Sequence, residues 1–148
     1  MEAGTVCQRP VFTVRPCDEV SRAAQLMREK HVGYLVVVDF DPLAQPVGVL
    51  TDRDIVVGVV ARDVDPKAMR VGDIMTRNPI TAGESDSVEA ALQKMREFGV
   101  RRLPIVNDRR ELVGVLAMDD VLKVIAGDAQ QVVNVIRNAR QIEGVTRR

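Results

Sequence analysis

The chain contains an internal repeat, which constrains its fold more than any other feature. Residues 4–55 return as residues 72–121, with matching residue types at an offset of 68 positions, and then of 66 after a shortened loop. The matched pairs include glycines, β-branched residues and acids: Gly4 with Gly72, residues 47–50 with 113–116, and Asp54 with Asp120. Two copies of one unit predict a pseudo-symmetric pair with a cleft between its halves. Positions where the copies differ then indicate which side of that cleft carries chemistry.

Size and composition favour one compact body. The chain has 148 residues, so each copy is too small to be more than marginally stable alone. We therefore expect the copies to bury surface against each other. Hydrophobic residues make up 46% of the chain and aromatic residues only 3%, which predicts an aliphatic core.

Charge and cysteine usage exclude several classes of protein. Lys and Arg together number 21, as do Asp and Glu, which argues against a nucleic-acid or anionic-membrane binder. His31 is the single histidine, and Cys7 and Cys17 have no metal-ligand partners at useful spacing, so we expect no metal site. No signal peptide or membrane-spanning run is present, which favours a cytoplasmic protein. Cys17 is interpreted as an ordinary residue near a helix start, with redox sensing as the alternative.

Hydrophobic periodicity predicts an α/β (α+β) fold, in which each copy is strand–helix–strand–strand–helix. In the first copy we expect a strand at 11–14, a helix from a cap at Cys17 or Asp18 to about Lys30, strands at 34–38 and 47–50, and a helix at 52–60. In the second we expect a helix capped at Ser85 or Asp86, with Glu89 completing a capping box, strands at 103–106 and 113–116, and a helix at 118–125.

These elements predict four segments. They are a first domain at 4–62, a linker and lead-in at 63–78, a second domain at 79–127, and an amphipathic helix at 129–148. The apolar stripe of that helix is expected to pack on the body or on a partner subunit.

The sequence resembles a tandem pair of cystathionine-β-synthase (CBS) domains, also called a Bateman module. The resemblance covers residues 4–126 and rests on the duplication, Asp-Ile-Met-Thr at 73–76, the run at 100–106, and Gly-Val-Leu-Thr-Asp-Arg-Asp at 48–54. It implies two βαββα repeats packed through their sheets. It also implies adenosine-containing ligands in the cleft and a likeness to stand-alone bacterial and archaeal signalling proteins, which often form homodimers.

The resemblance and the residues together place one main site on the first copy. Its motif, Gly-x-x-Thr/Ser-x-x-Asp, matches at Gly48, Thr51 and Asp54. The helix N-terminus after Leu50 favours phosphate, Asp54 can accept hydrogen bonds from ribose hydroxyls, and Gly48 allows close approach. Thr51 and Asp54 as mere helix caps are the alternative. Phosphates are expected to contact Arg101 and Arg102, contributed by the second copy.

The adenine of the ligand is expected in an apolar pocket of the first copy, lined by Phe12, Thr13, Val32, Tyr34 and Leu35. Plain core packing is an equal interpretation for Val32 and Leu35.

The second copy predicts a weaker site, formed by Asp120, Thr81 and Val100. There Ala117 replaces the motif hydroxyl, and the reciprocal cation positions hold Gly33 and Tyr34. Phosphate affinity should be poor at this site.

The expected function is therefore a non-catalytic regulatory module that senses AMP, ADP, ATP or NAD and signals through a conformational or dimer change. S-adenosylmethionine also fits the ligand class, and the protein target is not encoded in the chain. The alternative is a structural or dimerisation adaptor with vestigial nucleotide sites. An enzyme is disfavoured, because no base sits beside a nucleophile and no P-loop or clustered metal-ligand set is present.

Overall fold

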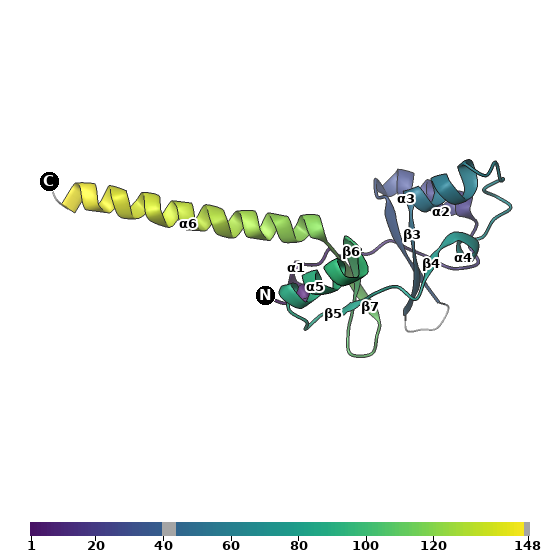
Figure 1. Ribbon diagram of the computed structural model, residues 1–148, viewed down its shortest axis with the longest axis horizontal. Helices are drawn as coiled ribbons and strands as arrows, with labels where there is room; N and C mark the ends of the chain where they lie inside the picture. The colour runs from purple at the N-terminus through teal and green to yellow at the C-terminus, as the bar shows by residue number, and fades with distance from the viewer. Residues whose placement is uncertain (40–43, 147–148) are drawn as a thin grey trace.

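The computed structural model describes residues 1–39 and 44–146. It confirms the α/β class, with two repeats built on small mixed sheets and a long C-terminal helix (Figure 1). Part of the turn expected at Asp39–Pro46 and the last two residues of the helix expected at 129–148 lie outside the described residues.

Each repeat carries its own sheet, and the two sheets share one pattern. The first has the order β1-β2-β3-β4, and its members are Thr13–Val14, Tyr34–Val38, Pro46–Thr51 and Thr76–Arg77. The second has the order β5-β6-β7, and its members are Ala82–Gly83, Arg102–Val106 and Leu112–Ala117. In both sheets the first pair is parallel and the next antiparallel. The short runs of β-branched residues therefore form strands where they were predicted.

One helix in each repeat makes the crossover between the parallel strands. These helices are α2 (Val20–Lys30) and α5 (Val88–Phe98). Each buries a stripe at helical spacing, Val20, Ala23 and Met27 in one and Val88, Ala91 and Met95 in the other. Each also ends on a left-handed residue, His31 in the first and Gly99 in the second.

The predicted N-caps of these two helices are wrong. Glu19 is the N-cap of α2, without a side-chain cap, while Asp18 accepts a hydrogen bond from the backbone N–H of Arg15. In the second repeat Ser87 caps α5 by accepting from Ala90, and Asp86 accepts from Gly83. In both repeats the aspartate closes the turn before the helix instead. A short polar side chain can bond the backbone that precedes it as well as the backbone that follows it.

The lead-in segment of each repeat packs on the other repeat. The short helix α1 (Ala3–Val6) contributes Ala3, Val6 and Cys7 to the hydrophobic cluster around Leu103 and Leu116. The short helix α4 (Val71–Ile74) contributes to the cluster around Leu35 and Leu50. In Figure 1 the purple α1 lies beside the green α5 for this reason. The two halves are therefore interlocked rather than merely apposed.

Backbone pairing reinforces this exchange. Gln8 forms an antiparallel bridge with Val115 of the second sheet, and β4 pairs with β3 of the first. Gly48 is required for this approach, since a Cβ there would meet Met75 Sδ at 2.7 Å and Thr76 O at 3.0 Å. Gly114 faces Cys7 and Gln8 in the same way. The close approach expected at Gly48, by backbone or by a ligand, is therefore an approach of backbone, because the segment ending in β4 fills that space.

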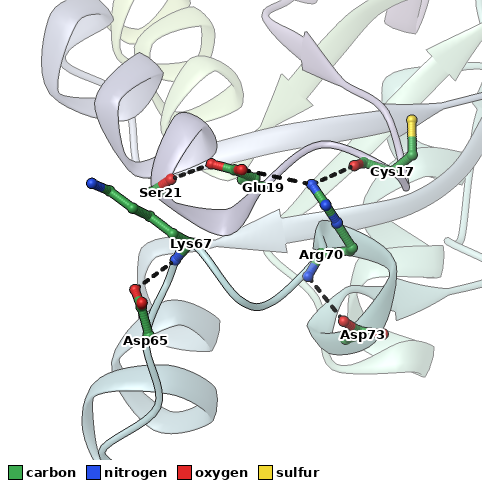
Figure 2. A network of polar contacts seen from close by, with 7 residues as sticks. All are labelled: Cys17, Glu19, Ser21, Asp65, Lys67, Arg70 and Asp73. Atoms are coloured by element: carbon green, nitrogen blue, oxygen red, sulfur yellow. Dashed lines mark hydrogen bonds and ion pairs between the residues drawn. The ribbon is translucent and has the colours of Figure 1, made fainter.

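The linker between the repeats is held to the start of α2 by polar contacts (Figure 2). The Arg70 guanidinium lies 3.9 Å from Glu19 and donates to the Cys17 carbonyl. Around it the backbone of Val20 donates to Met69 and that of Val71 to Asp18. The linker is therefore an ordered connection that positions α4 against the first sheet.

Each repeat ends in a helix that follows its last strand directly. The first is α3 (Asp52–Ile55), which continues as the π-helical turn η1 (Val56–Val60). The second is α6 (Met118–Thr146), a single 29-residue helix. The separate helices expected at 118–125 and 129–148 are therefore one element, which runs through Gly127 and away from the body (Figure 1).

Candidate functional site

A cavity of about 460 Å³ lies between the repeats. From the first repeat it is lined by Tyr34, Val49, Thr51 and Asp54, and from the second by Arg101 and Arg102. The remaining lining residues are mostly apolar and belong to the segment before β5 and to the end of α5: Thr76, Asn78, Pro79, Ile80, Phe98 and Val100. Its volume is typical of small-molecule sites, and both copies are needed to close it.

Thr51 and Asp54 form a reciprocal cap at the start of α3. The Thr51 hydroxyl accepts from the Asp54 backbone N–H at 3.1 Å, and Asp54 Oδ2 accepts from the Thr51 N–H at 2.9 Å. The cap fixes both side chains at the cavity wall. The Thr51 hydroxyl proton and Asp54 Oδ1 keep hydrogen-bonding capacity for a ligand.

The backbone N–H groups of this first turn are already bonded. The Asp52 N–H donates to the Gly33 carbonyl at 3.0 Å, and the Arg53 N–H donates to Asp52 Oδ1 at 2.8 Å. With Thr51 and Asp54 paired as well, no donor of this turn is left for a phosphate. The prediction that this helix N-terminus binds phosphate through its backbone is therefore wrong, because side chains and the Gly33 carbonyl satisfy it.

The cations of the cavity come from Arg101 and Arg102, which are exposed side chains at the start of β6. The Arg102 guanidinium lies 5.4 Å from the centre of the Tyr34 ring, a cation–π distance. Burial raises the pKa of the Tyr34 phenol, with Arg102 opposing the shift, so Tyr34 is a neutral donor at physiological pH. These two residues occupy the same position in the repeat and meet between the halves.

A second cavity, of about 230 Å³, is related to the first by the repeat. It is lined by Gln8, Phe12, Val32, Tyr34 and Ala117, with Arg102 on the shared wall. The grouping of Phe12 and Val32 with Thr51 and Asp54 is therefore corrected. They lie in the second cavity, while their counterparts Ile80 and Val100 lie in the first. The prediction of Val100 for the weaker site is therefore corrected as well.

The acid of the second motif, Asp120, is bonded within the protein and is not among the residues that line the second cavity. Asp120 is 8% exposed, and its Oδ1 accepts from the Gln8 side-chain amide at 2.8 Å while Oδ2 accepts from the Ala117 N–H. Gln8 corresponds to Thr76 in the other copy, which is too short to make this bond to Asp54. The two cavities thus differ at a third position, beyond Ala117 and the missing cation.

Three other predicted site residues lie away from both cavities. Leu35 is fully buried in the first core, which agrees with the alternative interpretation that it only packs in the core. Thr13 lines a surface cavity beside α2, and Thr81 lines another with Gln45 and Arg110. All three are on or beside strands whose side chains alternate between the faces of the sheet, so a neighbour in sequence points elsewhere.

Sequence reasoning missed Val49, Thr76, Asn78, Pro79, Ile80 and Phe98 in the first cavity, and Gln8, Pro10, Val11, His31 and Val115 in the second. The repeat itself holds the signal for most of them. Ile80 is the counterpart of Phe12, and a lead-in that packs on the other copy brings its apolar residues to the other copy's motif.

The two interlocked repeats, each with a paired cavity, define a class of protein, the tandem CBS pair. The profile of the CBS domain family matches residues 3–61 and 71–127, and the chain belongs to this family. It is 36% identical over 124 residues to the protein MK0525 of Methanopyrus kandleri, covering 84% of this chain.

Two solved structures of this class carry ligands. The CBS domain protein PAE2072 of Pyrobaculum aerophilum, complexed with AMP, has a TM-score of 0.74 and 30% identity, covering 81% of this chain and 89% of that one. The CBS domain pair of protein MJ0100, in complex with 5'-methylthioadenosine and S-adenosyl-L-methionine, has a TM-score of 0.74 and 26% identity, covering 86% and 98%.

The chain spans 62% of the length of MK0525. It spans 23% of the inosine-5'-monophosphate dehydrogenase of Methanocaldococcus jannaschii, with 34% identity over 122 residues, so relatives of this unit also occur within enzymes. Across the described residues, no helix combines the length and apolar character needed to cross a membrane.

Proposed function

We propose that this protein is a non-catalytic sensor of an adenosine-containing ligand, such as AMP, ADP, ATP or NAD, bound in the cavity between the repeats. The observation that carries the proposal is the distribution of groups around that one cavity. A hydroxyl and a carboxylate face it from one repeat and two guanidinium groups from the other, with apolar walls between them. A nucleotide carries groups that are complementary to these: a base with flat apolar faces, a ribose with hydroxyl groups joined to that base, and an anionic phosphate on the ribose.

Each part of the ligand has a matching partner. Asp54 accepts from a ribose hydroxyl through Oδ1, and the Thr51 hydroxyl donates to a ligand oxygen. The base lies between the apolar side chains of Ile80 and Val100. Arg101 and Arg102 bind the phosphate, since a guanidinium can donate two parallel hydrogen bonds to it.

The second cavity is proposed to bind such ligands weakly. The acid of its motif, Asp120, is already bonded to Gln8, the side chain of Ala117 has no hydroxyl, and the volume of this cavity is about half that of the first. The AMP bound to PAE2072 and the methylthioadenosine and S-adenosylmethionine bound to MJ0100 support the ligand class for a chain of this fold.

Signalling is proposed to run through Arg102. A phosphate that draws Arg102 away from the Tyr34 ring changes the wall shared by both cavities, and with it the angle between the repeats. A ligand shifts such an equilibrium only through its different affinity for the two arrangements. The described lining of the first cavity includes no imidazole, thiol or amine, which supports binding without catalysis.

Isothermal titration of the full chain with AMP, ATP, NAD and S-adenosylmethionine tests the proposal. We expect one strong site, lost in Asp54→Ala and retained in Asp120→Ala. These two substitutions are matched, because each acid caps the helix after its strand. Equal affinity at two sites, or loss of binding only in Asp120→Ala, would contradict it.

The adaptor function is the second candidate, favoured by the exposed length of α6. A thermal-shift screen separates the two functions, since a ligand that binds the native state raises the melting temperature. No stabilisation by any adenosine ligand would favour the adaptor.

A further inference from the structure

We propose that α6 is a self-association surface, which pairs antiparallel with the α6 of a second copy of this chain. The proposal is independent of nucleotide binding. It starts from the exposure of this helix. Val121 is buried in the second core, but Leu122, Ile125, Val132 and Ile136 are 54%, 54%, 59% and 51% exposed.

The surface of the whole molecule shows how much this helix leaves uncovered. The chain exposes 9975 Å², whereas a compact monomer of 16.3 kDa exposes roughly 7,500 Å². The helix α6 adds to this exposed surface, because it projects from the body for most of its length (Figure 1). An excess of about 2,500 Å² per copy is enough to supply a stable dimer interface, since obligate pairs bury 2,000 Å² or more in total.

The apolar residues follow the pattern of a helix that packs on another helix. Spaced alternately by three and four residues, Leu122, Ile125, Ala129, Val132, Ile136 and Ala139 form one continuous seam. The opposite face is polar, with Gln130, Gln131, Asn134, Asn138 and Gln141. That face is rich in amides rather than in Lys and Arg, so it favours a protein helix over an anionic membrane as the occupant.

Residue sizes fit an antiparallel arrangement. With Ala129 of one copy opposite Val132 of the other, Ile125 meets Ile136 and Leu122 meets Ala139, so each large residue has a partner that fills the layer. A parallel arrangement would instead place Ala129 on Ala129, which leaves a thin layer in the middle of the seam.

Charge selects the same arrangement. The antiparallel register brings Asp119 of one copy beside Arg140 of the other, twice by symmetry, at flanking positions of the seam. Both side chains are exposed, and neither forms a salt bridge within the part of the chain that the structure describes. In a parallel pair no opposite charges meet at the flanking positions. A second copy of this chain is therefore the occupant that the surface fits.

Sedimentation equilibrium of the full chain, without nucleotide, is the first test. We expect a dimer in the micromolar range, with Ile136→Asp monomeric there. Asn134→Asp is the matched control, since it adds the same charge to the opposite face of the same helix and should leave the dimer intact. A wild-type monomer, or a dimer unaffected by Ile136→Asp, would overturn the proposal. A wild-type monomer would indicate that α6 binds a different protein. A dimer that survives Ile136→Asp would indicate that the copies associate through the body.

Cysteine cross-linking in a Cys17→Ser background tests the orientation. A mixture of Ile125→Cys and Ile136→Cys chains should form a mixed disulfide dimer under mild oxidation, and neither chain alone should do so efficiently. Efficient cross-linking of each variant with itself would indicate parallel helices and overturn the arrangement.

A charge-reversal experiment tests the contact between the copies. Arg140→Asp should weaken the dimer about tenfold, and Asp119→Arg in the same chain should restore it. No restoration would contradict the Asp119–Arg140 contact. Circular dichroism confirms that each variant remains helical.

Discussion

At the scale of residues, the two cavities differ at the motif hydroxyl and at the neighbour of the motif acid, besides the reciprocal cation positions. Thr51 becomes Ala117, which removes a hydroxyl donor, and Thr76 becomes Gln8, which supplies an amide that bonds Asp120. The acid at each motif is the same residue in the same capping role. Whether this acid is available to a ligand depends on one side chain in the lead-in segment of the other repeat.

The first prediction restores the second cavity. Gln8→Ala with Ala117→Thr frees Asp120 Oδ1 and returns the hydroxyl, so the stoichiometry of adenosine or AMP binding should rise from one to two by isothermal titration. Gln130→Ala, on exposed α6, is the control and should leave one site. A stoichiometry that stays at one in the double variant would show that the missing cation or the smaller volume decides instead.

The second prediction concerns the two thiols. Cys17 is exposed, whereas Cys7 is half-buried and donates to the Gly4 carbonyl at 3.3 Å, and burial raises its pKa above the usual 9.0. Thiol titration should find one fast thiol, lost in Cys17→Ser, and one slow thiol.

The folded chain holds the Cys7 proton at a pH where the unfolded chain loses it. The stabilisation linked to Cys7 is therefore complete below pH 9 and declines as the pH rises above it. Equal reactivity of both thiols at neutral pH would contradict the burial of Cys7.

At the scale of elements, residue patterns predict the strands and helices well, but not how the helices start. The β-branched runs at 34–38 and 47–50 form strands because either face of such a segment can be buried. The caps predicted at Cys17 or Asp18 and at Ser85 or Asp86 were misplaced, because an aspartate such as Asp18 or Asp86 bonds a turn as readily as a helix terminus. Only neighbouring backbone geometry distinguishes the two uses.

The third prediction tests why Gly48 is in its strand. Gly48→Ala should lower the free energy of unfolding by about 1–3 kcal/mol, because its Cβ would press on Met75 and the Thr76 carbonyl. Gly127→Ala is the matched control on α6, with no atom within 4 Å of the added Cβ, and should cost nothing. Urea denaturation measures both. Equal stability of Gly48→Ala and wild type would show that β4 is free to move.

At the scale of the whole molecule, the exchange of lead-in segments holds the repeats together. Ala3 is fully buried against the second repeat, and Val71 against the first. Each core therefore contains residues from both repeats, so neither repeat completes its core from its own residues alone. Because of this exchange, Ile80 and Val100 reach the cavity of Thr51.

The fourth prediction compares two truncations. Deleting residues 1–8 removes Ala3 and Val6 from the second core and should cost at least about 2–5 kcal/mol of stability. Deleting 126–148 removes exposed helix and should leave the unfolding transition of the body nearly unchanged relative to the monomeric Ile136→Asp chain, which has also lost the proposed dimer contact. Thermal melts by circular dichroism measure both. A tolerated deletion of residues 1–8 would contradict the exchange.

The sequence by itself determined the repeat, the α/β class, the family and the asymmetry between the two motifs. These follow from local patterns: periodicity, turn residues and the identity of matched positions. Only the tertiary structure decided which apolar residues share a cavity with Thr51, that Gln8 occupies Asp120, and that one helix runs from Met118 to Thr146. The physical reason is that a repeat packed on itself and one packed on its neighbour bury the same residues, so hydrophobic pattern cannot tell them apart. Contacts between distant segments make that choice.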